Sequence, residues 1–237
     1  MFQTIFQRYE LKYLVTEVQK EKLLQGMKAH MQEDRYGQSI IRNIYFDTDN
    51  HRLIRRSIEK PAYKEKLRIR SYAQASDDSI VFVELKKKFD GVVYKRRLPM
   101  ALRDAMDWIE GGKDCPVDTQ IAREIQYFQK VYGEMHPAVF LSYRRQAYHA
   151  RDGSNFRVTF DDQVLCRREN LSLSAPVYGT PLLKEGMVLM ELKCAGGIPL
   201  WMAKLLSQER IYKTSFSKYG TAYQQLIFPQ KERITNG

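Results

Sequence analysis

The chain has 237 residues, 43% of them hydrophobic, which supports a real core and fits a single domain over residues 1–237. Lys and Arg outnumber Asp and Glu by 39 to 28, and the net charge of +11 favours phosphates, nucleic acid or an anionic membrane as partner. Three widely separated cysteines give no disulfide or zinc pattern, and no leader or bilayer-spanning apolar stretch is present, so we expect a soluble, cytoplasmic protein.

The first part of the chain is predicted to be mostly strands. We expect a strand over residues 5–15 and then a helix that begins at Thr16, because Thr16 and Gln19 have capping-box spacing. A strand over 40–48 ends in a turn at Asp49-Asn50. Further strands are expected over 62–72, 80–88 and 92–98, and the Asp90-Gly91 dipeptide between the last two predicts a β-hairpin.

Two helices are predicted in the middle of the chain. Pro99 is expected to open the first, which Gly111-Gly112 closes, and Asp118 is expected to cap the second. Strands return over 139–150, 155–166 and 188–193. A short helix follows Pro199, and a last helix covers 217–228. The pattern predicts an α+β fold with an antiparallel sheet, helices inserted between strands and a C-terminal helix.

Polar residues, all but one of them charged, occupy alternate positions in four of the predicted strands. They are Lys66, Arg68 and Arg70; Glu84 and Lys86; Arg157, Thr159 and Asp161; and Glu191 and Lys193. Successive strand residues point to opposite faces, so each strand has one ionic face and one apolar face. A solvated outer face explains any single strand. The repeated choice of Arg and Lys favours a closed sheet whose charged interior binds a polyanion with a divalent metal.

Eight segments carry a family resemblance, in this order along the chain: RYELKYLV, KLRIRSY, VFVELKKK, YKRR, YRRQAYHA, FRVTFDD, VLMELK and TSFSKYG. Together they resemble the polyphosphate polymerase domain of the vacuolar transporter chaperone (VTC) family, a branch of the triphosphate tunnel enzymes. The wider superfamily has an N-terminal Glu-x-Glu-x-Lys, whereas this chain has Arg8 before Glu10 and Lys12. The missing first glutamate favours the polymerase branch over the hydrolase and cyclase branches.

The resemblance implies an antiparallel β-barrel, the triphosphate tunnel fold, that transfers the terminal phosphoryl group of ATP to inorganic polyphosphate with Mn²⁺ or Mg²⁺. The implied catalytic cations are Lys12, Arg68, Arg70, Lys86, Arg145 and Arg157. Further phosphate-binding residues are Lys66, Lys95, Arg97, Lys193, Ser215, Ser217 and Lys218. Glu191 is the expected metal ligand, with Glu10 and Glu84 as weaker candidates.

This assignment suits phosphoryl transfer, which depends on positioning and on neutralising charge over the phosphate oxygens. A magnesium ion that bridges phosphates commonly needs only one or two carboxylates. Ser215, Ser217 and Lys218 surround the predicted start of the last helix, where free backbone N–H groups favour an anion.

Structural alternatives exist for several of these residues. Glu84 with Lys86, and Glu191 with Lys193, would serve equally well as internal salt bridges. Ser217 would cap a helix without any ligand. Strand phase does not decide between Arg144 and Arg145, and we choose Arg145 because Arg145-Gln146-Ala147-Tyr148 matches the family's Arg-x-Ala-aromatic pattern.

Two other functions use the same cations. One is a tunnel triphosphatase that hydrolyses inorganic or organic triphosphates, and the other is a non-catalytic polyphosphate-binding protein. We do not expect nucleic acid as a partner, because no helix concentrates basic residues on one face and no RNA-binding aromatic motif occurs. Export of a product would require a separate membrane protein.

Overall fold

The computed structural model describes residues 9–90 and 92–228. Its strands are β1 (Tyr9–Thr16), β2 (Met31–Asp47), β3 (Tyr63–Ser71), β4 (Ile80–Phe89), β5 (Val92–Ala101), β6 (His136–Ala150), β7 (Arg157–Arg167), β8 (Thr180–Pro181), β9 (Met187–Cys194) and β10 (Lys213–Thr214). Its helices are α1 (Glu17–Met27), α2 (Arg52–Ile58), α3 (Leu102–Ile109), α4 (Gln120–Tyr132), α5 (Leu200–Gln208) and α6 (Lys218–Ala222), and a π-helical turn, Tyr223–Ile227, follows α6. Residues 5–8 of the first predicted strand, and Gly91 of the predicted hairpin turn, lie outside the described residues.

The strands form one antiparallel sheet in the order β10-β1-β9-β7-β6-β2-β3-β4-β5, and β8 pairs with β7. The predicted α+β class with helices inserted between antiparallel strands is confirmed. The predicted closure into a barrel is not found, because within the described residues no strand pairing joins β5 to β10. Strand β10 contributes only two residues, Lys213 and Thr214, which is too short a ladder to continue the sheet to a closing partner.

The chain divides into two compact units. Unit 1 consists of residues 1–40, 143–164 and 183–217, and unit 2 of residues 41–142, 165–182 and 218–237. The divisions fall inside β2, β6 and β7, so these three strands contribute residues to both units. The single domain over residues 1–237 therefore stays a prediction.

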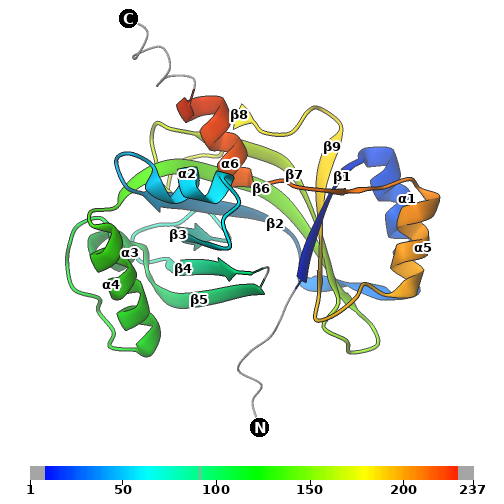
Figure 1. Ribbon diagram of the computed structural model, residues 1–237, viewed down its shortest axis with the longest axis horizontal. Helices are drawn as coiled ribbons and strands as arrows, with labels where there is room; N and C mark the ends of the chain where they lie inside the picture. The colour runs from blue at the N-terminus through cyan, green and yellow to red at the C-terminus, as the bar shows by residue number, and fades with distance from the viewer. Residues whose placement is uncertain (1–8, 91, 229–237) are drawn as a thin grey trace, which may run out of the picture. The chain divides into compact units, whose positions relative to one another are not determined.

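Unit 1 has a core between its strands and the helices α1 and α5, which lie side by side (Figure 1). Leu23 of α1 and Met202 of α5 are fully buried with Phe160 of β7. The predicted capping box starts α1, because the backbone N–H of Gln19 donates to Thr16 Oγ1 at 3.1 Å and that of Thr16 donates to Gln19 Oε1 at 3.0 Å. The sequence thus places this helix correctly.

Unit 2 has a separate core on one face of β3 and β4. Leu67, Ile69, Val83 and Leu85 are fully buried there and pack in the same cluster as Trp108 of α3. Burial of such a side chain contributes on the order of 1.5–3 kcal/mol. The helix pair α3 and α4 lies next to β3–β5 in Figure 1. The other face of these strands is consequently left for polar side chains.

Two predicted helix starts are wrong. Pro99 lies inside β5 opposite Phe82, and α3 begins three residues later at Leu102. Strand β5 is at the end of the sheet order, where the missing N–H of proline costs no ladder hydrogen bond. Thr119 rather than Asp118 caps α4, with its hydroxyl accepting from the backbone N–H of Ala122 at 3.1 Å. Asp118 forms an ion pair with Arg123 instead.

Helix α2 is an element that the sequence analysis missed. Its start is held by the buried Asp47, whose carboxylate accepts hydrogen bonds from the backbone N–H groups of Leu53 and Ile54 at 2.8 and 3.0 Å. The hydroxyl of Tyr219 also donates to Asp47, at 2.9 Å. The contact with Tyr219 spans 172 residues of sequence, so no local pattern reveals it. The two backbone contacts are local, and the sequence analysis did not recognise Asp47 as the start of a helix. The N-terminal half of β2 was missed as well, because residues 31–39 are mainly polar.

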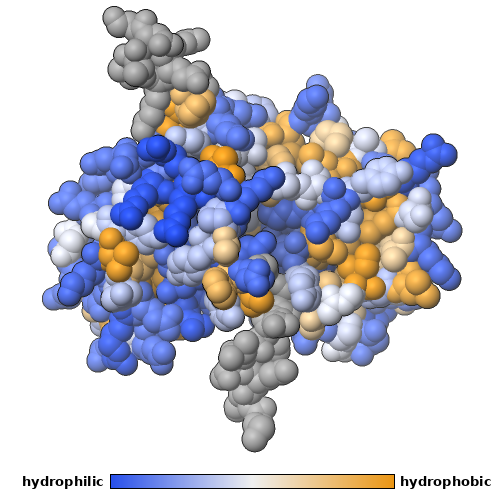
Figure 2. Space-filling model, in the orientation of Figure 1, coloured by the Kyte–Doolittle hydropathy of each residue, from blue (hydrophilic) through white to orange (hydrophobic). Residues whose placement is uncertain are grey.

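The surface of α2 is strongly basic. Figure 2 shows hydrophilic residues gathered over this helix, whose exposed side chains include Arg52, Arg55 and Arg56. At the C-terminal end of the chain, the predicted helix over 217–228 is confirmed by α6 and the π-helical turn. In the described part of the chain, the helices are all too short or too polar to cross a lipid bilayer.

Candidate functional site

Rows of charged side chains cross the strands of unit 2. Lys66, Lys86 and Lys95 are cross-strand neighbours on β3, β4 and β5. Two residues further along, Arg68, Glu84 and Arg97 form a second row. Alternate strand residues share a face, so both rows lie opposite the buried Leu67 and Leu85. With Arg70, which has the same phase, this charged face carries six of the predicted phosphate ligands: Lys66, Arg68, Arg70, Lys86, Lys95 and Arg97.

Glu84 is the centre of this charged face, with only 1% of its surface exposed. Its Oε2 accepts hydrogen bonds from Arg68 Nε and Nη2 at 2.8 and 2.7 Å, and Arg70 Nε lies 3.8 Å away. Its Oε1 lies 2.7 Å from Lys95 Nζ and accepts from Arg97 Nε at 2.7 Å. One carboxylate thus orders four cations, and the face keeps an excess of positive charge.

The charges of this cluster shift the pKa values of its members. Burial by itself would raise the pKa of Glu84, but the charges of Arg68, Arg70 and Lys95 hold it well below its ordinary value, so Glu84 stays ionised. Burial lowers the pKa of Lys95 to about 7; Glu84 opposes this shift, and the charges of Arg68 and Arg70 add to it. Lys95 therefore titrates near neutral pH.

Neutral side chains hold the arginines in place, and the sequence analysis missed them. Arg68 Nη1 donates to the hydroxyl of Tyr45 at 2.8 Å, and Arg70 Nε donates to Asn43 Oδ1 at 2.9 Å. Asn43 and Tyr45 alternate with the buried Ile44 and Phe46 in β2, so the same alternation test would have found them. Arg97 is fixed in a similar way, by a hydrogen bond of 2.7 Å to the hydroxyl of Tyr72.

Unit 1 has its own charged cluster, which involves β1, β6, β7 and β9. Glu191 is the cross-strand neighbour of Lys12 on one side and of Thr159 on the other. Arg145 makes a two-point contact with the fully buried Asp161, with Nε–Oδ1 and Nη2–Oδ2 distances of 2.6 Å each, and its Nη2 lies 3.4 Å from Glu191. Asp161 is a residue whose role the sequence analysis did not assign.

The pair of arginines on β6 is divided between two faces. Arg145 shares its face with Asp161 and Glu191, whereas Arg144 binds Asp162, with Nε–Oδ1 and Nη2–Oδ2 distances of 2.6 and 3.0 Å. Burial would lower the pKa of Arg145, but the charge of Asp161 raises it well above its ordinary value. Arg145 is therefore a fixed positive charge in this cluster.

Glu191 and Glu10 offer two oxygen donors close to one point. The ammonium group of Lys12 lies 3.4 Å from Glu10 Oε1 and 3.5 Å from Glu191 Oε1, and it donates to the carbonyl of Phe216 at 2.9 Å. A positive charge between two carboxylates occupies the kind of position that a divalent cation favours. This donor set fits a metal ion that takes most of its ligands from phosphates and water.

Glu84, by contrast, does not fit the predicted role of metal ligand. Both of its oxygens are already bonded to Arg or Lys groups, which would repel a divalent cation. Within the described residues, no group of three or more His, Cys, Asp or Glu side chains is placed to hold a metal ion. Of the predicted metal ligands, Glu191 and Glu10 remain, and a metal site at these two residues stays a prediction.

The remaining predicted residues occupy varied surroundings. Arg157 is about half exposed and pairs with Asp34 at 2.8 Å, and Lys193 Nζ lies 3.7 Å from Glu191 Oε2. Ser215 is exposed, Ser217 is half-buried, and Lys218 is buried as the first residue of α6. A phosphate site at Ser215, Ser217 and Lys218 stays a prediction.

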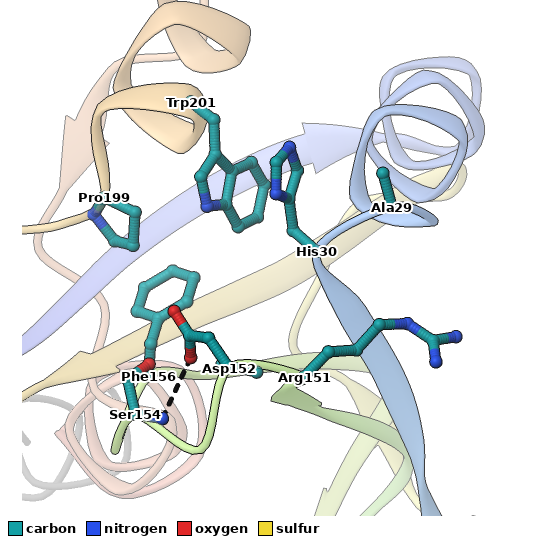
Figure 3. A pocket seen from close by; sticks show the side chains of 9 residues that line it. Ala29, His30, Arg151, Asp152, Ser154, Phe156, Pro199 and Trp201 are labelled. Carbon is teal, nitrogen blue, oxygen red and sulfur yellow. Dashed lines mark hydrogen bonds between the residues drawn. The ribbon is translucent and has the colours of Figure 1, made fainter.

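A separate pocket of about 310 Å³ lies in unit 1 (Figure 3). His30 stacks on Trp201 with 4.3 Å between the ring centroids, and Phe156 meets Trp201 edge-on at 5.9 Å. On the other side of the pocket, Asp152 accepts a hydrogen bond from the backbone N–H of Ser154 at 2.9 Å. The residues that line this pocket include none of the predicted phosphate ligands.

Comparisons with known proteins agree with the predicted fold. A family model described as "VTC domain" matches residues 7–227. A candidate adenylate cyclase from Bacillus halodurans has a similar structure, with a TM-score of 0.55 and 14% identity over 93% of this chain and 99% of that chain. At this level of identity the likeness concerns the fold alone.

Two further structures are less similar. A candidate adenylate cyclase from Vibrio parahaemolyticus has a TM-score of 0.49 and 12% identity, over 92% of this chain and 98% of that one. A protein from Pyrococcus horikoshii has a TM-score of 0.45 and 13% identity, over 95% and 98% of the two chains. The search of curated proteins finds no match.

The pKa of Lys95 predicts a pH dependence of anion binding. Since this pKa is about 7 without ligand, Lys95 loses its charge as the pH rises above neutrality, and a polyanion must then bind with uptake of a proton. We expect the affinity for polyphosphate to fall as the pH rises above 7. The ligand-free protein should instead gain stability from Lys95 over that range, because only the unfolded chain keeps the proton.

Titration calorimetry between about pH 6 and pH 9 measures this effect. Lys95→Arg is the matched variant, because arginine keeps its charge throughout that range. Its affinity should be almost constant where that of the wild type falls. Identical pH profiles for the two proteins would contradict the role of Lys95.

Proposed function

Because this chain belongs to the VTC domain family, we propose that it transfers the terminal phosphoryl group of ATP to inorganic polyphosphate with the help of a divalent metal. The observation that carries the proposal is the row of Lys66, Lys86 and Lys95 across three neighbouring strands. Like charges on directly opposite positions destabilise a sheet. A bound polyanion offsets this repulsion, so the row is explained by a phosphate-rich ligand.

The spacing of the cations favours a linear ligand over a single phosphate. The lysine row and the Arg68–Glu84–Arg97 row are successive on the same face, and Arg70 extends the series by one more position. Positive charge therefore repeats along the strands as well as across them. A polyphosphate chain, which carries negative charge at every unit, matches such a surface better than a compact anion does.

In the proposed reaction, a terminal oxygen of polyphosphate forms a bond to the γ-phosphorus of ATP while the bond to ADP breaks. The arginines supply planar N–H forks for the phosphate oxygens, and the contacts of Glu84 hold them in position before substrate arrives. A divalent metal, when bound, would neutralise negative charge on phosphate oxygens. Glu191 and Glu10 would hold it, after Lys12 moves from between them.

One observation supports non-catalytic polyphosphate binding as a second candidate. The carboxylate of Glu191 lies within 3.7 Å of three cations, those of Lys12, Arg145 and Lys193. A carboxylate that is neutralised in this way has less attraction for a metal. A binding protein would need the cations alone, and Glu191 would then serve only to balance their charge.

Product analysis distinguishes these functions. With ATP and Mn²⁺, we expect the purified protein to release ADP and to form an acid-stable polymer that gives a ladder on a gel. Arg68→Ala combined with Arg70→Ala should lose the ladder, because both guanidinium forks are removed. Orthophosphate without polymer would indicate a triphosphatase instead, and the absence of any product with Mn²⁺ or Mg²⁺ would favour the binding protein.

A comparison of two carboxylates tests the metal assignment. Glu191→Gln should shift the Mn²⁺ concentration needed for half-maximal turnover upwards by about tenfold or more, since loss of even a supporting group costs a metal site this much. Polyphosphate binding should be retained, because only a negative charge is removed. Glu84→Gln is the matched control, and it should lower turnover at every Mn²⁺ concentration without moving the midpoint. Equal midpoints for both variants would place the metal elsewhere.

A further inference from the structure

Arg42 of β2 is a buried cation, and two of its three guanidinium nitrogens have no hydrogen-bond partner within the described residues. Its phase in the strand is that of Ile44 and Phe46, so it lies on the apolar face of unit 2, opposite the charged rows. Only 7% of its surface is exposed, and within the described residues neither its Nε nor its Nη1 has a hydrogen-bond acceptor. The described carboxylates form no ion pair with it. Burial lowers its pKa, as expected for an uncompensated charge.

A second unpartnered polar group, the hydroxyl of Ser142, lies nearby on β6. Strands β2 and β6 are neighbours in the sheet, and the side chain of Asn43 donates to the carbonyl of Leu141 at 3.0 Å. Arg42 directly precedes Asn43 in the chain, and Ser142 directly follows Leu141. Ser142 is fully buried, and no acceptor or donor for its Oγ is found among the described residues. A buried guanidinium and a buried hydroxyl thus occupy neighbouring strands.

Another buried arginine adds to the positive potential on this face. Arg167 of β7 lies with its guanidinium carbon 3.6 Å from the ring centroid of Phe140, which has the phase of Ser142 on β6. Burial lowers the pKa of Arg167, and the charge of Arg42 lowers it further. Arg167 is stabilised by carbonyls, including those of Asn170 at 3.0 Å and Tyr178 at 3.2 Å. For Nε and Nη1 of Arg42, the described residues supply no such acceptor.

Burial of an uncompensated charge destabilises a protein, whereas burial of an apolar side chain stabilises it. Buried charges in proteins are therefore normally paired. Here two guanidinium groups lie near each other, and only one has acceptors. We propose that Arg42 and Ser142 bind a compact inorganic anion, chloride or inorganic phosphate, on the apolar face of unit 2. The guanidinium of Arg42 and the hydroxyl of Ser142 donate hydrogen bonds to the anion, and the positive charge of Arg167 raises the affinity of the site for it. This site does not depend on the proposed function.

Thermal unfolding at constant ionic strength tests this site. When gluconate is replaced by chloride or by phosphate, the wild-type midpoint should rise and then saturate as the site fills. In Arg42→Met, which keeps a long apolar side chain but has no N–H donor, this saturable rise should be lost. Lys113→Gln is the matched control, because it removes an exposed cation that belongs neither to this site nor to the charged rows, and it should keep the rise. The anion that produces the rise identifies the ligand.

Three results would overturn the proposal. The first is a wild-type midpoint that responds to neither anion, and the second is a full response in Arg42→Met. The third is an Arg42→Met midpoint raised equally in all three salts, which would mean that Arg42 only costs stability. If Arg42→Met does not fold, Ser142→Ala replaces it, and its affinity for the anion should be about tenfold weaker. An unchanged affinity in Ser142→Ala would contradict the site.

Discussion

The ion pairs of Glu84 are the interaction on which the charged face of unit 2 depends. Arg68, Arg70, Lys95 and Arg97 all approach this one buried carboxylate, on strands where their charges would otherwise repel each other. Removing one partner of a buried ion pair leaves an uncompensated charge and costs about 3–5 kcal/mol. Glu84 therefore permits a dense array of cations to fold, and the remaining positive charge is available to a ligand. The same role as an anchor for cations explains why Glu84 is a poor metal ligand.

The register of the strands links this charged face to the core. Leu67 and Leu85 are paired across β3 and β4 one residue away from the pairs that bring Lys66 to Lys86 and Arg68 to Glu84. A shift of one residue would move the cations into the apolar core and the leucines into the charged face. Packing of the apolar face against α3 and α4 thus fixes the positions of the phosphate-binding candidates, which lie on the opposite face of the same strands.

Local patterns were sufficient to predict most strands, the α1 capping box and the face on which the cations lie. They failed where distant contacts decide. Asp47, at the start of helix α2, is hydrogen-bonded to Tyr219, 172 residues away, and Pro99 is tolerated inside β5 because this strand is at the end of the sheet. Glu84 matches a metal ligand by sequence alone, since only the strand register reveals its cation partners. Local sequence also could not tell which of Arg144 and Arg145 faces the charged cluster. The answer comes from a different strand, where Asp161 pairs with Arg145 and Asp162 with Arg144.

The central claim, that one face of β3–β5 binds a phosphate chain, is tested most directly by the salt dependence of polyphosphate binding in two neighbouring lysine variants. Lys86 lies on the charged face, whereas Lys87 lies on the opposite face, 3.7 Å from Glu65. Each cation that contacts the chain contributes to the slope of log affinity against log salt concentration. Lys86→Gln should reduce this slope by about one unit, and Lys87→Gln should leave it unchanged. Equal slopes for both variants, or a reduced slope in Lys87→Gln alone, would contradict the account.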